Sequence, residues 1–402
     1  MRLTRLADLG LSSGVNFLLG VALARGSNST EFGFYSFLLL GYLLVLYLTR
    51  AVVGEGALLL AVEDRDLRRL TPQASSAALT VGIGCTVVAI PMAAIAGGES
   101  RTVTMIIVLT FPLIAVQDAA RYLLLARGRS VATAISDGTW VVVAAVAVIA
   151  LPQGNVTAVV LIWAFGGVGA ALIGLGTIGW PRLSPHYVRE WLATVGRNRL
   201  GALLGDNLIT FATSLLFSVV TAALLDLATL GMIRKALVVL GPVSIFNNAL
   251  TVMLLADRDL GVLTMRRCLG VGAVAATPAL LWGAALLGPA TGFGRLLTGP
   301  GWDETRAYLP ALSLYLSLQA VALVAMIVIK RLGNPTSTAR LRALALGVQT
   351  VAVAAGAAAG GFGVAIGLVV AWLVLAAVTT VVLRTQLQRT KINALQTGRI
   401  GA

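Results

Sequence analysis

The hydrophobic and polar positions form long apolar runs that are separated by short polar segments. Each run is roughly 20 residues or longer, the length that a helix needs to cross a hydrocarbon layer of ~30 Å. Because a spanning segment must satisfy its own backbone hydrogen bonds in lipid, the pattern predicts α-helices. Twelve runs occur, at about 5–24, 34–61, 74–97, 102–126, 130–151, 155–179, 200–224, 228–255, 267–288, 303–330, 340–360 and 362–384. We therefore predict an all-α, polytopic membrane protein with about 12 transmembrane helices.

The composition supports this prediction and narrows the chemistry. Hydrophobic residues make up 58% of the chain and charged residues 11%, which is outside the range of soluble domains. His186 is the only histidine, so a multi-histidine metal centre is excluded. Cys85 and Cys268 both fall in predicted spans and indicate no disulfide framework. No metal or cofactor is expected.

The net charge of +14 is explained by topology rather than by nucleic acid. If the N-terminus is cytoplasmic, most of the basic residues, 22 of 30, fall in predicted inner segments. Only four fall in predicted outer segments: Arg25, Arg101, Arg295 and Arg306. This positive-inside asymmetry predicts a multi-pass protein of the cell (plasma or inner) membrane with both termini in the cytoplasm.

The longest internal polar connection divides the chain in the middle. Ser184 and Pro185 are typical of a helix cap and first turn. An apolar stripe follows at Val188, Trp191, Leu192 and Val195. This pattern predicts an amphipathic helix on the inner leaflet. The expected parts are an N-terminal six-helix lobe at 1–181, a cytoplasmic linker at 182–199, a C-terminal six-helix lobe at 200–385 and a cytoplasmic tail at 386–402.

The two halves are predicted to be an internal repeat of the same orientation. Asp8 aligns with Asp206, Ser12 with Thr210, Asn16 with Ser214 and Gly20 with Ser218. Asp-Arg-Asp turns at 64–66 and 257–259 also align and are expected to form exposed ion pairs. The four-residue steps place the polar groups of the first and seventh spans on one helical face. That face either packs against other helices or lines a hydrated cavity between the lobes.

Charged residues also fall inside the predicted spans. Asp118 and Arg121 are three residues apart in the fourth span, which favours a structural ion pair. Arg50 and Glu55 in the second span are five apart and do not face each other. Arg50 therefore needs a partner elsewhere, either a phosphate or an acid on another helix.

The eighth span contains two adjacent cations, Arg234 and Lys235, which have no acid within four residues along the chain. Adjacent side chains point about 100° apart on a helix, so one of the two is expected to point inward. The pair either extends toward the outer headgroups or forms a cationic clamp for an anionic substrate. Pro242 follows as a candidate hinge.

Three segments carry a resemblance to a known family. They are FLLGVALARGSNSTEFGFYSFLLLGYLL at 17–44, QDAARYLLLARGR at 117–129 and LLDLATLGMIRKALVVLGPVSIF at 224–246. Together they resemble polysaccharide-biosynthesis, O-antigen-flippase-like proteins of the multidrug/oligosaccharidyl-lipid/polysaccharide exporter superfamily. The first segment has an Ala-Arg pair, a short polar loop and then Phe-Gly. The last has Gly231, Arg234 and Gly241-Pro242.

The resemblance implies a V-shaped, two-lobe transporter, not an enzyme, that flips a polyprenyl-diphosphate-linked oligosaccharide between leaflets by alternating access. Its implied partners are this lipid-linked oligosaccharide, the lipid bilayer, and glycosyltransferases and a polymerase of the same pathway, but no nucleic acid. The implied substrate-binding residues are Arg50, Arg234, Lys235, Asn16 and Asp206. Residues that could serve coupling or gating are Asp8, Glu55, Asp118 and Arg121.

Three alternatives remain open. A cation-coupled drug or small-molecule exporter of the same superfamily would use an intramembrane acid as its coupling site. A major-facilitator transporter requires loop glycines where this chain has Leu60 and Leu67. A polytopic glycosyltransferase requires a large external loop, and the longest here is only about 289–302.

Overall fold

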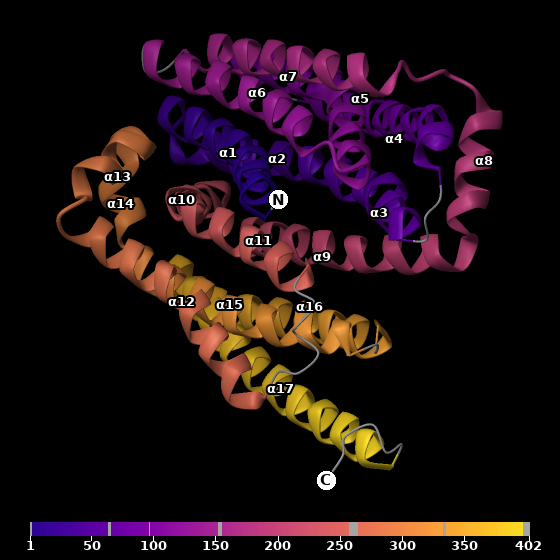
Figure 1. The fold of residues 1–402 in the computed structure, drawn as a ribbon. Helices are drawn as coiled ribbons and strands as arrows, with labels where there is room; N and C mark the ends of the chain where they lie inside the picture. The colour runs from indigo at the N-terminus through magenta and orange to yellow at the C-terminus, as the bar shows by residue number, and fades with distance from the viewer. Residues whose placement is uncertain are drawn as a thin grey trace. The chain divides into compact units, whose positions relative to one another are not determined.

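The computed structural model describes residues 2–62, 66–95, 97–151, 155–256, 264–332 and 335–396, and all its regular elements are helices (Figure 1). No β-strand occurs within these ranges. The chain divides into two compact units, Met1–Leu215 and Leu216–Ala402. The predicted all-helical fold class is confirmed.

The first unit contains the elements from the N-terminus to the middle of α9. They are α1 (Arg2–Gly26), α2 (Ser29–Thr49), η1 (Arg50–Gly54), α3 (Glu55–Val62), α4 (Leu67–Ile95), α5 (Gly98–Ala126), α6 (Ser130–Ala150), α7 (Val156–Ile178), α8 (Pro185–Val195) and α9 (Arg197–Leu224). The division between units falls inside α9, so the lobe boundaries expected from the sequence stay a prediction.

The second unit contains the rest of α9 and the elements that follow it. They are α10 (Leu227–Val239), α11 (Gly241–Ala256), α12 (Met265–Leu287), α13 (Thr291–Thr298), η3 (Gly299–Gly301), α14 (Trp302–Arg306), α15 (Leu309–Arg331), α16 (Pro335–Ala357) and α17 (Gly360–Gln396).

The helices cover the twelve predicted spans, and three of these spans contain more than one helix. Nine helical segments in the described ranges are long and apolar enough to cross a membrane. A tenth candidate is the pair α10 and α11, which is bent by 57° near Pro242. The remaining two predicted spans correspond to α1 and α16, with 25 and 23 residues. The chain is a multi-pass membrane protein.

Each unit is built around one deeply buried helix. Of the nine candidate spans, α5 and α15 have the largest buried share of their apolar window, 67% each. In the first unit α5 packs against α2, α4 and α7, and in the second unit α15 packs against α12 and α17. These helices are the fourth and tenth predicted spans, which are equivalent places in the two proposed repeats.

The second span is interrupted by a π-helical turn, η1, between α2 and α3. A π turn inserts extra backbone into an α-helix and often marks a functional site. Glycine is required at its end, because a Cβ on Gly54 would lie 2.8 Å from the ring of Tyr122 on α5. The turn therefore lies tightly against α5 and begins with Arg50.

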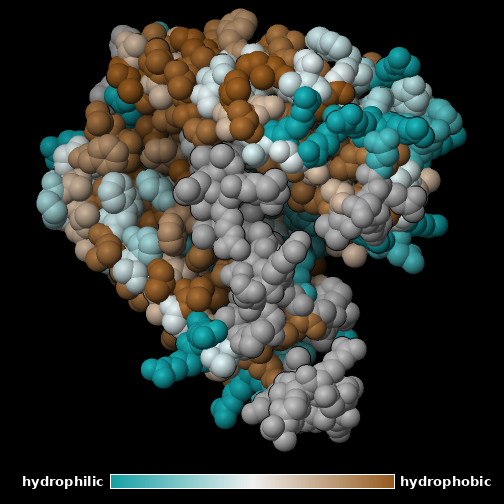
Figure 2. All heavy atoms as spheres, viewed as in Figure 1, coloured by the Kyte–Doolittle hydropathy of each residue, from teal (hydrophilic) through white to brown (hydrophobic). Residues whose placement is uncertain are grey.

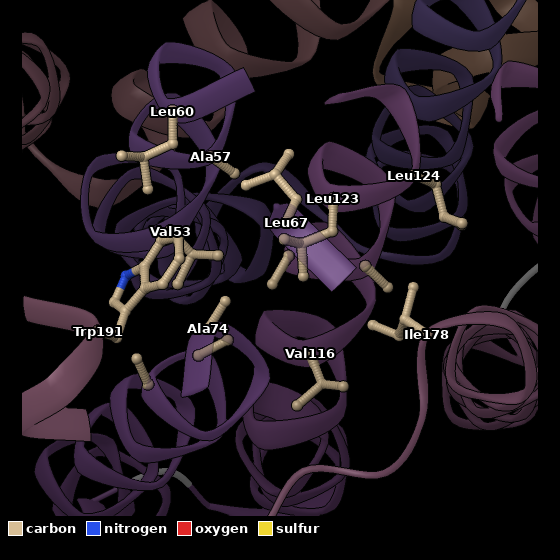
Figure 3. Packing of buried hydrophobic residues seen from close by; sticks show 14 of the residues in the cluster. Val53, Ala57, Leu60, Leu67, Ala74, Val116, Leu123, Leu124, Ile178 and Trp191 are labelled. Atoms are coloured by element: carbon tan, nitrogen blue, oxygen red, sulfur yellow. The ribbon is translucent and has the colours of Figure 1, made fainter. Parts of the chain in front are cut away.

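Helix α8 corrects one expectation from the sequence. Its start at Pro185, after the N-cap Ser184, is as predicted. The apolar stripe, however, packs against protein rather than facing the inner leaflet, and Trp191 is completely buried. The Trp191 indole donates a hydrogen bond of 2.8 Å to the Val52 carbonyl in the π turn. Figure 3 shows Trp191 beside Val53 in this apolar cluster.

The surface of the first unit has an apolar region and a hydrophilic region. Figure 2 shows apolar side chains over α6 and α7, and hydrophilic side chains over the end of the unit near α4 and α8. Large apolar residues on the outside of these helices include Val142, Ile149 and Phe165, which are 61%, 81% and 70% exposed. Such faces suit contact with lipid.

Candidate functional site

A buried network of charged side chains joins three helices of the first unit. Asp118 on α5 lies between two guanidinium groups. Its Oδ2 is 3.5 Å from Nε of Arg50, and its Oδ1 is 3.4 Å from Nη2 of Arg121. Arg121 also reaches Asp137 on α6, with Nη1 3.9 Å from Oδ2. The four side chains contain two positive and two negative charges when all are ionised.

Local structure explains why these groups meet. The π turn places Arg50 against α5. Asp118 and Arg121 are three residues apart on α5, so they share one helix face. Gln117 precedes them and donates a hydrogen bond of 2.5 Å to Oδ1 of Asp137. The arrangement therefore links α5 to α6 through Asp137 and to the second span through Arg50.

The two carboxylates are held unequally. Asp118 contacts two guanidinium groups, whereas in the described part of the chain Asp137 forms an ion pair with one, that of Arg121, at a longer distance. Both residues are buried. One oxygen of each, Oδ2, has no hydrogen-bond partner among the described residues. Of the two carboxylates, Asp137 therefore has the weaker ionic restraint.

Aromatic side chains lie beside the network, and two of them, Tyr42 and Trp140, line the same small cavity as Arg50, Asp118 and Asp137. Trp140 and Trp163 are buried with ring centroids 5.2 Å apart, and Tyr42 meets Trp163 edge to face at 5.8 Å. The Trp140 indole donates a hydrogen bond of 2.8 Å to the Trp163 carbonyl. Apolar walls of this kind keep the local dielectric low and strengthen the charge interactions inside.

Asn16 on α1 completes the polar cluster. Its Oδ1 accepts a hydrogen bond of 2.5 Å from the Tyr42 hydroxyl. Asn16, Arg50, Asp118 and Asp137 line one small cavity with about 10 Å³ of space, close to the size needed for one water molecule. The structure thus brings Asn16 together with three of the charged residues, inside the first unit.

Other predicted site residues of the first unit lie outside this network. Glu55 accepts a hydrogen bond of 3.2 Å from Asn207 on α9. The Asp206 side chain is half-buried on the same helix. The position of the Asp8 side chain lies outside what the structure describes, and so do Asp64 and Asp257 of the two Asp-Arg-Asp turns. The roles assigned to these residues stay predictions.

In the second unit the two predicted cations are buried differently. Arg234 on α10 donates a hydrogen bond of 2.6 Å to the Ser218 hydroxyl and lies 5.0 Å above the ring of Phe217. Lys235 is only 1% exposed. A second aromatic group lies in the same unit, where Tyr315 meets Trp372 edge to face. Arg234 is thus held against α9, and Lys235 is enclosed rather than extended to headgroups.

Sequence analysis missed Asp137. The residue lies in a predicted span, and an acid at that depth is itself a signal for function. It has no oppositely charged residue within four positions on its own helix, so local spacing suggests no partner. Its partners, Gln117 and Arg121, come from α5 and become visible only in three dimensions.

Comparison by sequence gives no relative, since no family model and no curated protein matches the chain. Comparison by structure gives clear matches. An inward-facing multidrug resistance MATE family transporter of the MOP superfamily aligns with a TM-score of 0.67 at 17% identity, covering 96% of this chain and 95% of that chain. The outward-facing conformation of such a transporter aligns with a TM-score of 0.64 at 16% identity, covering 97% and 95%.

A third structure, a MATE protein in complex with MaL6, aligns with a TM-score of 0.68 at 16% identity over 97% of this chain and 96% of that one. At such low identity the likeness establishes the fold. The chain has the fold of MATE transporters of the MOP superfamily, and it is similar to both inward-facing and outward-facing examples.

Proposed function

We propose that this chain is a proton-coupled exporter of small amphipathic molecules that works by alternating access. The observation that carries the proposal is the buried network of Arg50, Asp118, Arg121 and Asp137 inside the first unit. The similarity of the whole chain to solved multidrug transporters supports the exporter role better than it supports the flippase role expected from the sequence.

Coupling follows from the charge balance of the network. A proton on Asp137 removes its ionic attraction for Arg121, and the ion pair of Arg121 with Asp118, within α5, remains. The ionic link between α5 and α6 is lost, while the hydrogen bond from Gln117 can remain. Because one charge in a low-dielectric site changes the interaction energy by several kcal/mol, roughly 4 at 4 Å and an effective dielectric of 20, the protonation state can favour one packing of α5 and α6 over another.

The proposal is tested by reconstituting the purified protein in liposomes with an acidic interior. The probes are a panel of fluorescent amphipathic dyes of positive, zero and negative charge. We expect at least one dye to accumulate inside, and a protonophore to abolish the accumulation. Accumulation that is insensitive to the proton gradient would refute the coupling mechanism.

A second candidate function is the flipping of a polyprenyl-diphosphate-linked oligosaccharide, and the two adjacent cations of α10 favour it. Arg234 and Lys235 make that part of the unit basic, which suits an anionic head group. Against it, Arg50 is neutralised by Asp118 rather than left for a phosphate. Flipping of a fluorescent polyprenyl-diphosphate sugar that is lost in the variant Arg234→Ala with Lys235→Ala would favour this candidate over the exporter.

A further inference from the structure

A basic cavity lies at one end of the first unit, apart from the buried network. It has a volume of about 670 Å³, within the usual range of ligand pockets. Its polar lining comes from Arg68 at the start of α4, from Arg127 and Arg129 between α5 and α6, and from Asp66. The network of Asp118 and Asp137 does not use this cavity, so a function for it is independent of the proposed transport mechanism.

Arg127 is fixed in place by the protein. It follows the last residue of α5, and one terminal nitrogen donates to the Leu67 carbonyl at 3.1 Å and to the Thr71 hydroxyl. Its Nε is buried and has no hydrogen-bond partner among the described residues. The guanidinium is therefore pre-positioned, with part of its hydrogen-bonding capacity unused.

A glycine turn brings a second guanidinium to the same cavity. Gly128 has a φ of +72°, a conformation that costs a residue with a side chain roughly 1 kcal/mol or more. It separates Arg127 from Arg129, and both line the cavity. The tight turn thus places two cations on one short segment where a helix ends and the next begins.

The positive charge of the cavity is not balanced by its described neighbours. None of Arg68, Arg127 and Arg129 forms an ion pair with a carboxylate in the described part of the chain. The Asp66 carboxylate is engaged by Nε of Arg69 at 3.4 Å and by the backbone N–H of Arg68 at 3.1 Å. Segment 63–69, EDRDLRR, contains three acids and three arginines, so its formal charges cancel. The positive charges of Arg127 and Arg129 are therefore not compensated by this segment.

Two features show that this arrangement is electrostatically unfavourable by itself. Arg68 lies in the first turn of α4, where the positive end of a helix dipole disfavours cations, and the one described acid there, Asp66, directly precedes the helix. Burial, together with repulsion from Arg68 and Arg129, lowers the pKa of Arg127. A bound anion would relieve both effects.

We propose that this cavity binds a phosphate group through Arg68, Arg127 and Arg129. Guanidinium groups match phosphate oxygens in geometry and charge. The floor of the cavity is apolar and includes Ala61, Leu67 and Ile178, two of which Figure 3 labels in the adjoining apolar cluster. The phosphate group belongs either to an anionic phospholipid or to a phosphorylated solute. The same guanidinium groups would bind it in both cases.

The test measures binding to the full-length protein in detergent, without any transport assay. Thermal stability is followed while phosphatidylglycerol, phosphatidylcholine or inorganic phosphate is added. We expect phosphatidylglycerol to raise the melting temperature and phosphatidylcholine to have no comparable effect. The variant Arg68→Gln with Arg129→Gln should bind the anion about a hundredfold more weakly, because it loses two hydrogen bonds to a charged group and each contributes a factor of about ten or more.

Arg68 and Arg129 are chosen because they are exposed and their side chains support no described contact, so the variant is expected to fold. The matched control is Arg182→Gln with Arg189→Gln, two exposed arginines that do not line the cavity. Stabilisation by inorganic phosphate equal to that by phosphatidylglycerol would support the site and identify the source as a solute. Equal stabilisation of wild type and both variants, or stabilisation by neither anion, would overturn the proposal.

Discussion

At the residue scale, Asp118 is the side chain on which the buried network depends most. It is 2% exposed and holds Arg50 from the second span and Arg121 from its own helix. The sequence allowed the pair of Asp118 and Arg121 to be predicted, because they are three residues apart. It also indicated that Arg50 needs either a phosphate or an acid on another helix. The sequence could not decide between a phosphate and an acid, because it is the π turn that brings Arg50 to Asp118 on α5.

The first prediction concerns Asp118→Asn. Removing this charge takes from Arg50 and Arg121 the buried carboxylate that they share, so the free energy of unfolding should fall by about 3 kcal/mol or more. Thermal or denaturant unfolding in detergent measures the change. The control is Asp303→Asn, an acid that is 78% exposed and 3.6 Å from Arg295, for which the change should be within about 1 kcal/mol. An equal loss in both variants would contradict the assignment.

At the element scale, the first unit is held together by close contacts with α5. Hydropathy predicted the existence of α4 and α5, but not how closely they approach. The approach depends on Gly82, where a Cβ would lie 2.5 Å from Cα of Pro112. Likewise, the apolar stripe of α8 could be predicted from the sequence. The surface against which it packs could not, because lipid and a protein core both select apolar residues.

The second prediction compares two glycines of α4. Gly82→Ala should destabilise the protein by about 1–3 kcal/mol, because the backbone of α5 cannot move aside without loss of packing. Gly84 has open space around its Cβ position, so Gly84→Ala should be neutral or stabilise by up to about 1 kcal/mol through helix propensity. Unfolding in detergent distinguishes the two. Similar effects of both substitutions would argue against the close packing of α4 on α5.

The third prediction concerns the contact between α8 and the π turn. Trp191→Phe retains an aromatic ring but removes the donor to the Val52 carbonyl, so stability should fall by about 1–3 kcal/mol. Trp180→Phe is the control, because Trp180 is 66% exposed. If the Trp191 variant is as stable as the control, α8 does not depend on this hydrogen bond.

At the scale of the whole molecule, the bilayer explains why so much of the fold could be predicted. Each span must be a long apolar helix, and all twelve predicted runs are helices in the structure. The site was harder to predict because its members are far apart in sequence, from Asn16 to Asp137. The expectation of a lipid-linked substrate came from resemblance, and the structural neighbours are multidrug transporters instead.

The fourth prediction concerns orientation. The positive-inside asymmetry predicts that both termini lie in the cytoplasm. Fusion of alkaline phosphatase to the C-terminus should give no activity in cells, whereas a fluorescent protein at the same place should be bright. An active phosphatase fusion would reverse the predicted topology.

If Asp137 exchanges a proton during transport, as we propose, its substitution should uncouple gradient-driven accumulation from exchange in liposomes. The dye that the wild type accumulates is supplied to Asp137→Asn, first with a proton gradient and then without a gradient as exchange between labelled and unlabelled dye. The account predicts that Asp137→Asn loses accumulation driven by the gradient and retains exchange, whereas Asp303→Asn retains both. Accumulation by Asp137→Asn at the wild-type rate would contradict it.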